Sequence, residues 1–162
     1  MSRHVQQHSA ASRFLAALCV VAALSGCGSA QEAALDQASQ RARTRAQAAN
    51  DNVVALLGGA DYQPADDEEL LADTIDRVRG TDANGYVFAS RTPGPGQVEI
   101  DAGFDDSGDA GLIGPHTHAL VRLCVRITGT RPGPVTINDV PCQPFNDPAQ
   151  PGGPRETISL DG

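Results

Sequence analysis

The chain has 162 residues, with 20 acidic and 12 basic side chains and a formal charge of −8 at pH 7. Nucleic acids repel such a surplus of negative charge, so we expect no nucleic acid among its partners. Aromatic residues make up 4% of the chain and tryptophan is absent, which leaves aliphatic side chains and alanine to build the core.

The first 26 residues have the pattern of a secretory signal peptide. Arg3 and Arg13 precede the apolar run Phe14–Leu24, and this region contains no acidic residue. The run has about eleven residues, whereas a membrane-spanning helix needs roughly 17–25. The charged start, the short apolar middle and the small residues that follow therefore predict a cleaved signal over residues 1–26.

The end of this segment, Leu24-Ser25-Gly26-Cys27, resembles the lipobox of bacterial lipoproteins. The resemblance implies that Cys27 receives a diacylglyceryl group with acyl chains such as palmitate, and that cleavage leaves Cys27 as the first mature residue. Each buried methylene contributes about 0.8 kcal/mol, so two or three chains hold a protein on a membrane far longer than one. We therefore expect a lipid-anchored protein on the extracytoplasmic face of the cell membrane. The alternative is an ordinary secreted protein in which Cys27 is incidental.

The overall composition is similar to that of actinobacterial lipoproteins. Every basic residue is arginine, and alanine, glycine, proline and aspartate are abundant. Cleavage before Cys27 would remove two arginines and no acid, which leaves a mature charge near −10. Such a charge favours solubility above the membrane.

Residues 27–59 are expected to form the anchor and an alanine-rich helical spacer. Apolar residues recur at helical spacing over 30–57, and Gly58-Gly59 ends the segment. The helix is either a stalk or is docked on the domain through its Val53–Leu57 end, and we favour docking because that end is too apolar to stay in water. The stripe consists of Leu35, Ala38, Ala42, Ala49, Val53 and Leu56.

Three arginines of this segment, Arg41, Arg43 and Arg45, lie close to the predicted anchor. Arg41 and Arg45 share one face of the helix, and Arg43 points elsewhere. The cluster either attracts anionic lipid headgroups or is a solvated helix face. We favour the solvated face.

Residues 60–145 are expected to form a small α+β domain that begins with a helix over 66–79. Asp66 can cap this helix, with Glu69 three residues later as in a capping box, and Gly80 can end it. Leu71, Ile75 and Val78 form one apolar face, with Leu70 beside it, and this face has to pack on the strands that follow.

From residue 86 the hydrophobic period changes to two, which predicts strands. The fold class is therefore α+β, an antiparallel sheet of about four strands with the 66–79 helix over one face. Residues 105–115 are expected to form a loop rich in Asp and Gly, and 146–162 a Pro/Gly-rich tail in which 156–160 could add an edge strand. The predicted strands cover 86–91, 97–104, 118–128 and 135–142.

Two cysteines remain once Cys19 has left with the signal and Cys27 carries lipid. Thiols outside the cytoplasm pair readily, so we predict a disulfide between Cys124 and Cys142. A metal or redox pair is the alternative, although the spacing is not Cys-x-x-Cys. In the predicted hairpin, Cys124 lies opposite Cys142 and Arg126 opposite Val140, with Arg131–Val135 as the loop.

His116 and His118 are the sharpest chemical feature of the mature chain. Positions i and i+2 of an extended segment point the same way, so both rings could hold one metal ion. Zinc requires three or four ligands, and Asp101, Asp105, Asp106 and Asp109 precede the histidines. The alternative, which we favour, is two partly exposed histidines at the entrance of a strand, with no metal and no cofactor.

The chain carries no Gly-x-Ser-x-Gly motif and no phosphate-binding glycine loop. We therefore expect a non-catalytic domain that binds an envelope protein or a small ligand. The opposing hypothesis is a metal-binding or hydrolytic domain that uses His116, His118 and nearby aspartates.

Overall fold

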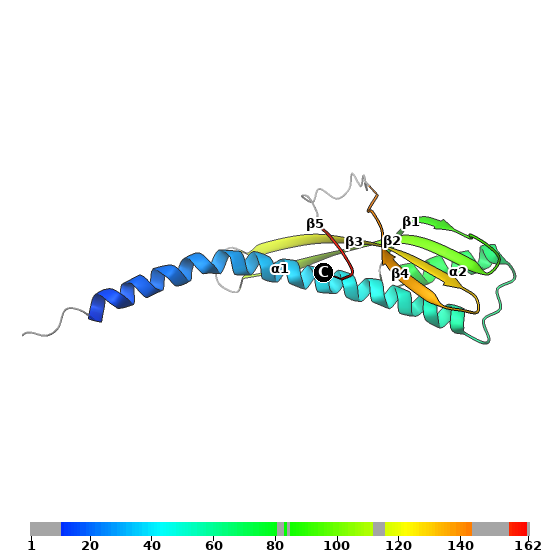
Figure 1. Ribbon diagram of the computed structural model, residues 1–162, viewed down its shortest axis with the longest axis horizontal. Helices are drawn as coiled ribbons and strands as arrows, with labels where there is room; N and C mark the ends of the chain where they lie inside the picture. Colours follow the sequence, from blue (N-terminus) through cyan, green and yellow to red (C-terminus); the bar gives the residue numbers. More distant parts are fainter. Residues whose placement is uncertain (1–10, 81–82, 84, 112–115, 144–155, 162) are drawn as a thin grey trace, which may run out of the picture.

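The computed structural model describes residues 11–80, 83, 85–111, 116–143 and 156–161, with side chains from Ala30 onward. It contains two helices and one sheet, which confirms the predicted α+β class (Figure 1). Within these residues, none of the helices combines the length and the apolar character that crossing a membrane requires. The elements are α1 (Ala11–Gly58), α2 (Asp67–Arg79), β1 (Tyr86–Arg91), β2 (Gln97–Ala110), β3 (Thr117–Thr130), β4 (Val135–Asp139) and β5 (Glu156–Ile158).

The sheet is built around one long hairpin. Strands β2 and β3 have 14 residues each and pair antiparallel along their whole length. β1 lies beside β2, and β4 lies beside β3. β5 runs parallel to β3 and pairs with residues 121–123, next to the stretch 125–129 that pairs with β4. Residues 156–158 therefore form a strand within the stretch 156–160 that the sequence offered as one.

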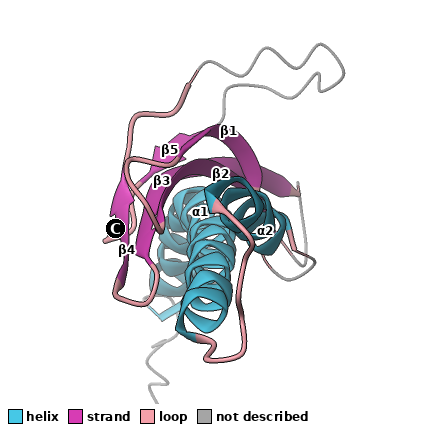
Figure 2. Cartoon of the chain, turned by 90° about the vertical axis from the view of Figure 1, so that its right-hand side faces the viewer, coloured by secondary structure: helices cyan, strands magenta, loops and turns pink. Residues whose placement is uncertain are grey.

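The sheet curves around α1, which fills its concave side (Figure 2). One face of the helix is fully buried, and small side chains on this face allow the helix and the strands to approach closely. The contact extends from Ala34 to Leu57, beyond the Val53–Leu57 end that the sequence favoured, so this part of α1 belongs to the core and is not a stalk. The buried face consists of Ala34, Ala38, Ala42, Ala46, Ala49, Val53 and Leu57.

This arrangement corrects the expectation that the 66–79 helix is the main cover of the sheet. The long helix α1 packs along both β2 and β3, whereas α2 lies at one end and packs on α1, β1 and β2. The reason is length, because a helix of 13 residues spans only about 20 Å at 1.5 Å per residue. A hairpin of 14-residue strands needs a longer cover.

Gly108 of β2 lies against the backbone of α1. A Cβ atom at this position would lie 2.0 Å from the carbonyl oxygen of Ala34. We therefore expect Gly108→Ala to push α1 away from β2 and to lower the free energy of unfolding by about 1–3 kcal/mol. Denaturant unfolding measures the change.

Gly58→Ala is the matched control, because a Cβ there meets nothing within 4 Å. This variant should leave the unfolding free energy nearly unchanged. Equal destabilisation by the two variants would mean that the close contact at Gly108 is absent.

Helix α2 has the predicted caps. The Asp66 carboxylate accepts hydrogen bonds from the backbone N–H groups of Glu68 and Glu69, at 3.0 and 2.9 Å. Asp67 accepts one from the N–H of Gly96 at 2.9 Å, which ties the first turn of the helix to the turn between β1 and β2. The buried face differs slightly from the prediction, because Leu70, Thr74 and Val78 are buried whereas Leu71 and Ile75 are only partly so.

Two features of the predicted strands are wrong. Residues 105–110 form the last part of β2, not a loop. The β3–β4 register is also shifted by two residues, so that Arg126 lies opposite Asn138 and Cys142 lies beyond the end of β4. The shift pairs Ile137 with Ile127 in the sheet, and it brings two apolar side chains next to each other.

Candidate functional site

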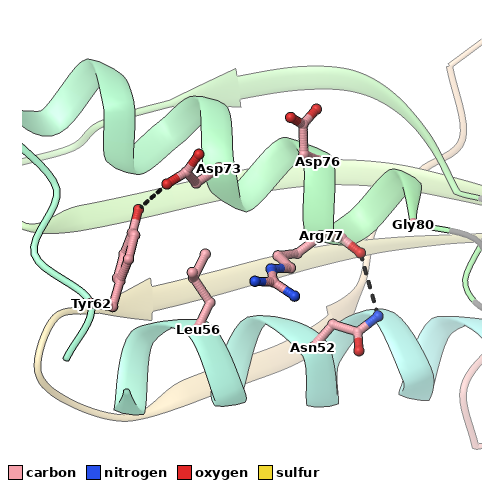
Figure 3. Close-up of a pocket in the computed structure, with 7 residues that line it drawn as sticks. All are labelled: Asn52, Leu56, Tyr62, Asp73, Asp76, Arg77 and Gly80. Carbon is pink, nitrogen blue, oxygen red and sulfur yellow. Dashed lines mark hydrogen bonds between the residues drawn. The ribbon is translucent and has the colours of Figure 1, made fainter. Parts of the chain in front are cut away.

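A cleft with polar walls lies between the two helices, at the end of α1 where the chain turns into α2 (Figure 3). This α1–α2 cleft has a volume of about 660 Å³. Both helices contribute side chains to it, and the segment that connects them contributes one tyrosine. The lining residues are Asn52, Leu56, Tyr62, Asp73, Asp76, Arg77 and Gly80.

Tyr62 is held in place from two sides. Its hydroxyl donates a hydrogen bond to Asp73 Oδ2 at 2.7 Å, and the Arg131 guanidinium carbon lies 5.3 Å from the centre of its ring. Burial, the hydrogen bond to Asp73 and the negative charges of Asp73 and Glu69 raise the pKa of Tyr62 above its ordinary value of 10. The phenol is therefore neutral at physiological pH and acts as a hydrogen-bond donor.

Side chains of opposite charge line the cleft, and they come from the same helix. Asp73, Asp76 and Arg77 all belong to α2, and Figure 3 shows the Arg77 side chain reaching toward α1. Asn52 of α1 donates a long hydrogen bond, 3.5 Å, to the Arg77 carbonyl. Such a lining suits the binding of a polar group. Sequence reasoning did not single out Asp73 or Asp76, because the cleft forms only where α1 and α2 pack together.

The predicted histidine and aspartate set is not brought together. His118 Nδ1 lies 2.8 Å from Asp109 Oδ1, its cross-strand neighbour, and both side chains are largely exposed. Both carboxylate oxygens of Asp105 accept from Arg122, at 2.7 and 2.8 Å. His116 precedes β3 and is exposed. Across the described part of the chain, no three metal-ligating side chains gather at one point.

The outer face of the β2–β3 hairpin carries a ladder of ion pairs instead. Asp101 accepts two hydrogen bonds from Arg126, at 2.7 and 2.8 Å, in the same arrangement as Asp105 with Arg122. The Asp109–His118 contact is the third step. The Asp101 hydrogen bond raises the pKa of Arg126 further above its ordinary value. These aspartates therefore pair across the hairpin with the arginines and the histidine of β3.

The arginine cluster has a structural role that corrects the expectation of a solvated helix face. β1 pairs with residues 99–103 of β2 only. Beyond them, Arg45 and Arg41 donate hydrogen bonds to the carbonyl oxygens of Asp105 and Ser107, both at 3.1 Å. Two side chains of α1 thus bond carbonyl oxygens along a part of the β2 edge that β1 does not pair with.

The remaining arginine of the cluster fixes the C-terminal segment. Arg43 Nε donates to the Ser159 carbonyl at 2.9 Å. The Asp139 carboxylate accepts from the N–H of Leu160, at 3.0 and 3.2 Å. Together with the pairing of β5, these contacts hold the end of the chain against β3 and α1.

Cys124 and Cys142 lie at disulfide distance, with their sulfurs 2.05 Å and their Cα atoms 5.3 Å apart. Cys124 is on the outer face of the hairpin, with Arg122 and Arg126. It is buried, and its carbonyl accepts a hydrogen bond from Val140 at 3.0 Å.

Cys27 lies in the backbone of α1, seven residues before Ala34, and its side chain is outside the described part. Comparison with protein-family models, curated proteins and solved structures found no match for this chain.

Proposed function

We propose that this chain is a lipid-anchored lipoprotein of the cell envelope, whose mature part is a non-catalytic binding domain on the extracytoplasmic face. The observation that carries the proposal is the lipobox-like Leu24–Cys27 after a short apolar run. The fold is compatible with it. Among the side chains that the structure describes, which begin at Ala30, the first buried one on α1 is that of Ala34, so cleavage before Cys27 is compatible with the described core.

Two further observations support this compartment. Cys124 and Cys142 lie at disulfide distance, and disulfides persist outside the cytoplasm. The mature charge near −10 keeps such a domain soluble above the membrane.

The α1–α2 cleft is the binding surface that we assign to this domain. It is open, its walls carry both carboxylates and a guanidinium, and Leu56 and Tyr62 give it an apolar floor. We propose an envelope protein or a small polar ligand as its partner, and no nucleic acid.

The anchor has a direct test in the cells that produce the protein. Cys27→Ser should abolish incorporation of an alkyne-tagged palmitate and should move the protein from the membrane fraction to the soluble fraction or leave it unprocessed. The reason is that only a thiol at this position accepts the diacylglyceryl group.

Cys19→Ser is the matched control, because this cysteine lies inside the apolar run and leaves with the signal. It should keep both the label and the membrane location. Retention of the label by Cys27→Ser would overturn the proposed anchor.

The opposing proposal, a metal-binding or hydrolytic domain, has one supporting contact, the 2.8 Å approach of His118 to Asp109. Metal analysis of the purified mature domain separates the two. Stoichiometric zinc or copper that is lost on His116→Ala would favour the metal site. A metal-free protein would favour the binding domain.

A further inference from the structure

The domain has two ends, and the first packed turns of α1 lie at only one of them. The Ala34 carbonyl lies against Gly108, and Gln37 Oε1 accepts a hydrogen bond from the Asp109 N–H at 3.1 Å. The end of the β2–β3 hairpin, Asp109–Gly111 and His116–His118, therefore lies beside the first packed turns of α1. Figure 1 shows α2 and the β1–β2 turn at the opposite end.

The chain between the predicted anchor and the packed helix is short. Only residues 28–33 separate Cys27 from Ala34, and the backbone of α1 is helical throughout. At 1.5 Å per residue, seven steps along this helix span about 10 Å. The headgroup layer of a bilayer is itself roughly 5–8 Å thick on each side. An anchored domain thus has almost no free tether.

We infer that the hairpin end of the sheet faces the lipid headgroups and that the α1–α2 cleft faces away from the membrane. The inference rests on the proposed acylation of Cys27. Residues 34–57 of α1 are packed along the sheet, and their length of about 35 Å sets the height of the cleft above the hairpin end. A partner therefore reaches the cleft from the side remote from the bilayer.

The hairpin end lies against the headgroup layer whatever the charge of the lipids, and it does not bind anionic lipids specifically. Asp109 and His118 contact each other at this end, and Glu32 and Asp36 of α1 are exposed near it. Arg41 and Arg45 already donate to carbonyl oxygens of β2. The tether, and not charge attraction, sets the orientation, so it should not depend on the anionic lipid content.

Energy transfer to labelled headgroups tests the orientation. The lipidated full-length product is reconstituted in phosphatidylcholine vesicles that carry a headgroup-linked acceptor, with and without phosphatidylglycerol. A donor dye is attached at His116→Cys or, in the matched variant, at Ala60→Cys; both positions are exposed. We expect several-fold higher transfer from residue 116 than from residue 60, in both lipid mixtures.

A seven-residue insertion after Ala30 adds two helical turns, or about 10 Å, and keeps the helical phase. It should lower transfer from residue 116 while the protein stays on the vesicles. Equal transfer from the two positions, or no effect of the insertion, would overturn the orientation and leave the anchor intact. Protein that does not remain on the vesicles would overturn the anchor itself, and the orientation with it.

Discussion

Phe104→Ala should lower the free energy of unfolding by about 3–5 kcal/mol, the usual cost of removing a fully buried aromatic ring. Phe104 is the largest side chain that is completely buried in the described part of the protein. Its ring is also tightly enclosed, because a Cβ atom added to Gly85 would lie 2.7 Å from its Cε1 atom. With tryptophan absent, little else in the core can compensate for the loss.

Phe88→Ala provides the comparison for this prediction. Phe88 lies on β1, is only partly buried, and contacts Tyr86 with ring centres 6.0 Å apart. Phe88→Ala should lower the free energy of unfolding by about 1 kcal/mol, mainly because the contact between the two aromatic rings is lost. Both variants can be followed by urea unfolding with circular dichroism. A smaller effect for Phe104→Ala than for Phe88→Ala would show that the core is not centred where α1, α2 and β2 meet.

Loss of the bridge between Cys124 and Cys142 should destabilise the domain by roughly 3 kcal/mol in the chain-entropy model, given the loop that it closes. The two residues are 18 apart in sequence. Since β4 has only five residues, the bridge and the hydrogen bond from the Val140 N–H to the Cys124 carbonyl hold the chain after β4 to the central strand. Cys142→Ala is the better variant, because Cys124 is buried and Cys142 is not.

Reduction gives the matched measurement. Dithiothreitol should lower the stability of the wild-type protein to that of Cys142→Ala and leave the variant unchanged. Mass spectrometry after non-reducing digestion should find the two cysteine peptides linked. Two thiols that alkylate readily in the native protein would contradict the bridge.

Local signals predicted the helix ends and the strand faces correctly. Asp66 and Gly80 mark the two ends of α2, because the first caps the helix and the second follows its last residue. Alternation along β3 places the partly exposed Arg122 and Arg126 on one face and the buried Leu123, Val125 and Ile127 on the other, because successive side chains of a strand point to opposite faces. These signals depend on neighbours in sequence and need no knowledge of the rest of the fold.

The role of α1 could not be predicted in the same way. Alanine buries little area, so an alanine stripe is equally consistent with a solvated helix and with a closely packed one. Gly108 allows the closely packed arrangement, because the backbone of α1 occupies the space that a side chain at this position would fill. That contact joins residues more than seventy positions apart, which no local pattern reports.

The ion-pair ladder was present in the sequence but was not recognised. Asp101, Asp105 and Asp109 recur every four residues, and so do His118, Arg122 and Arg126 on the returning strand. In an antiparallel hairpin the two series face each other in one register. Comparing them would have extended β2 through residues 105–110 and removed these aspartates from the candidate metal site.

We propose that a lipid on Cys27 holds this domain outside the cell. Intact-mass analysis of the protein from the membranes of its own host tests it most directly. We predict a chain that begins at Cys27 and carries two or three acyl chains on that residue. A chain that begins at Met1, carries no acyl group and is recovered from the cytosol would contradict the account.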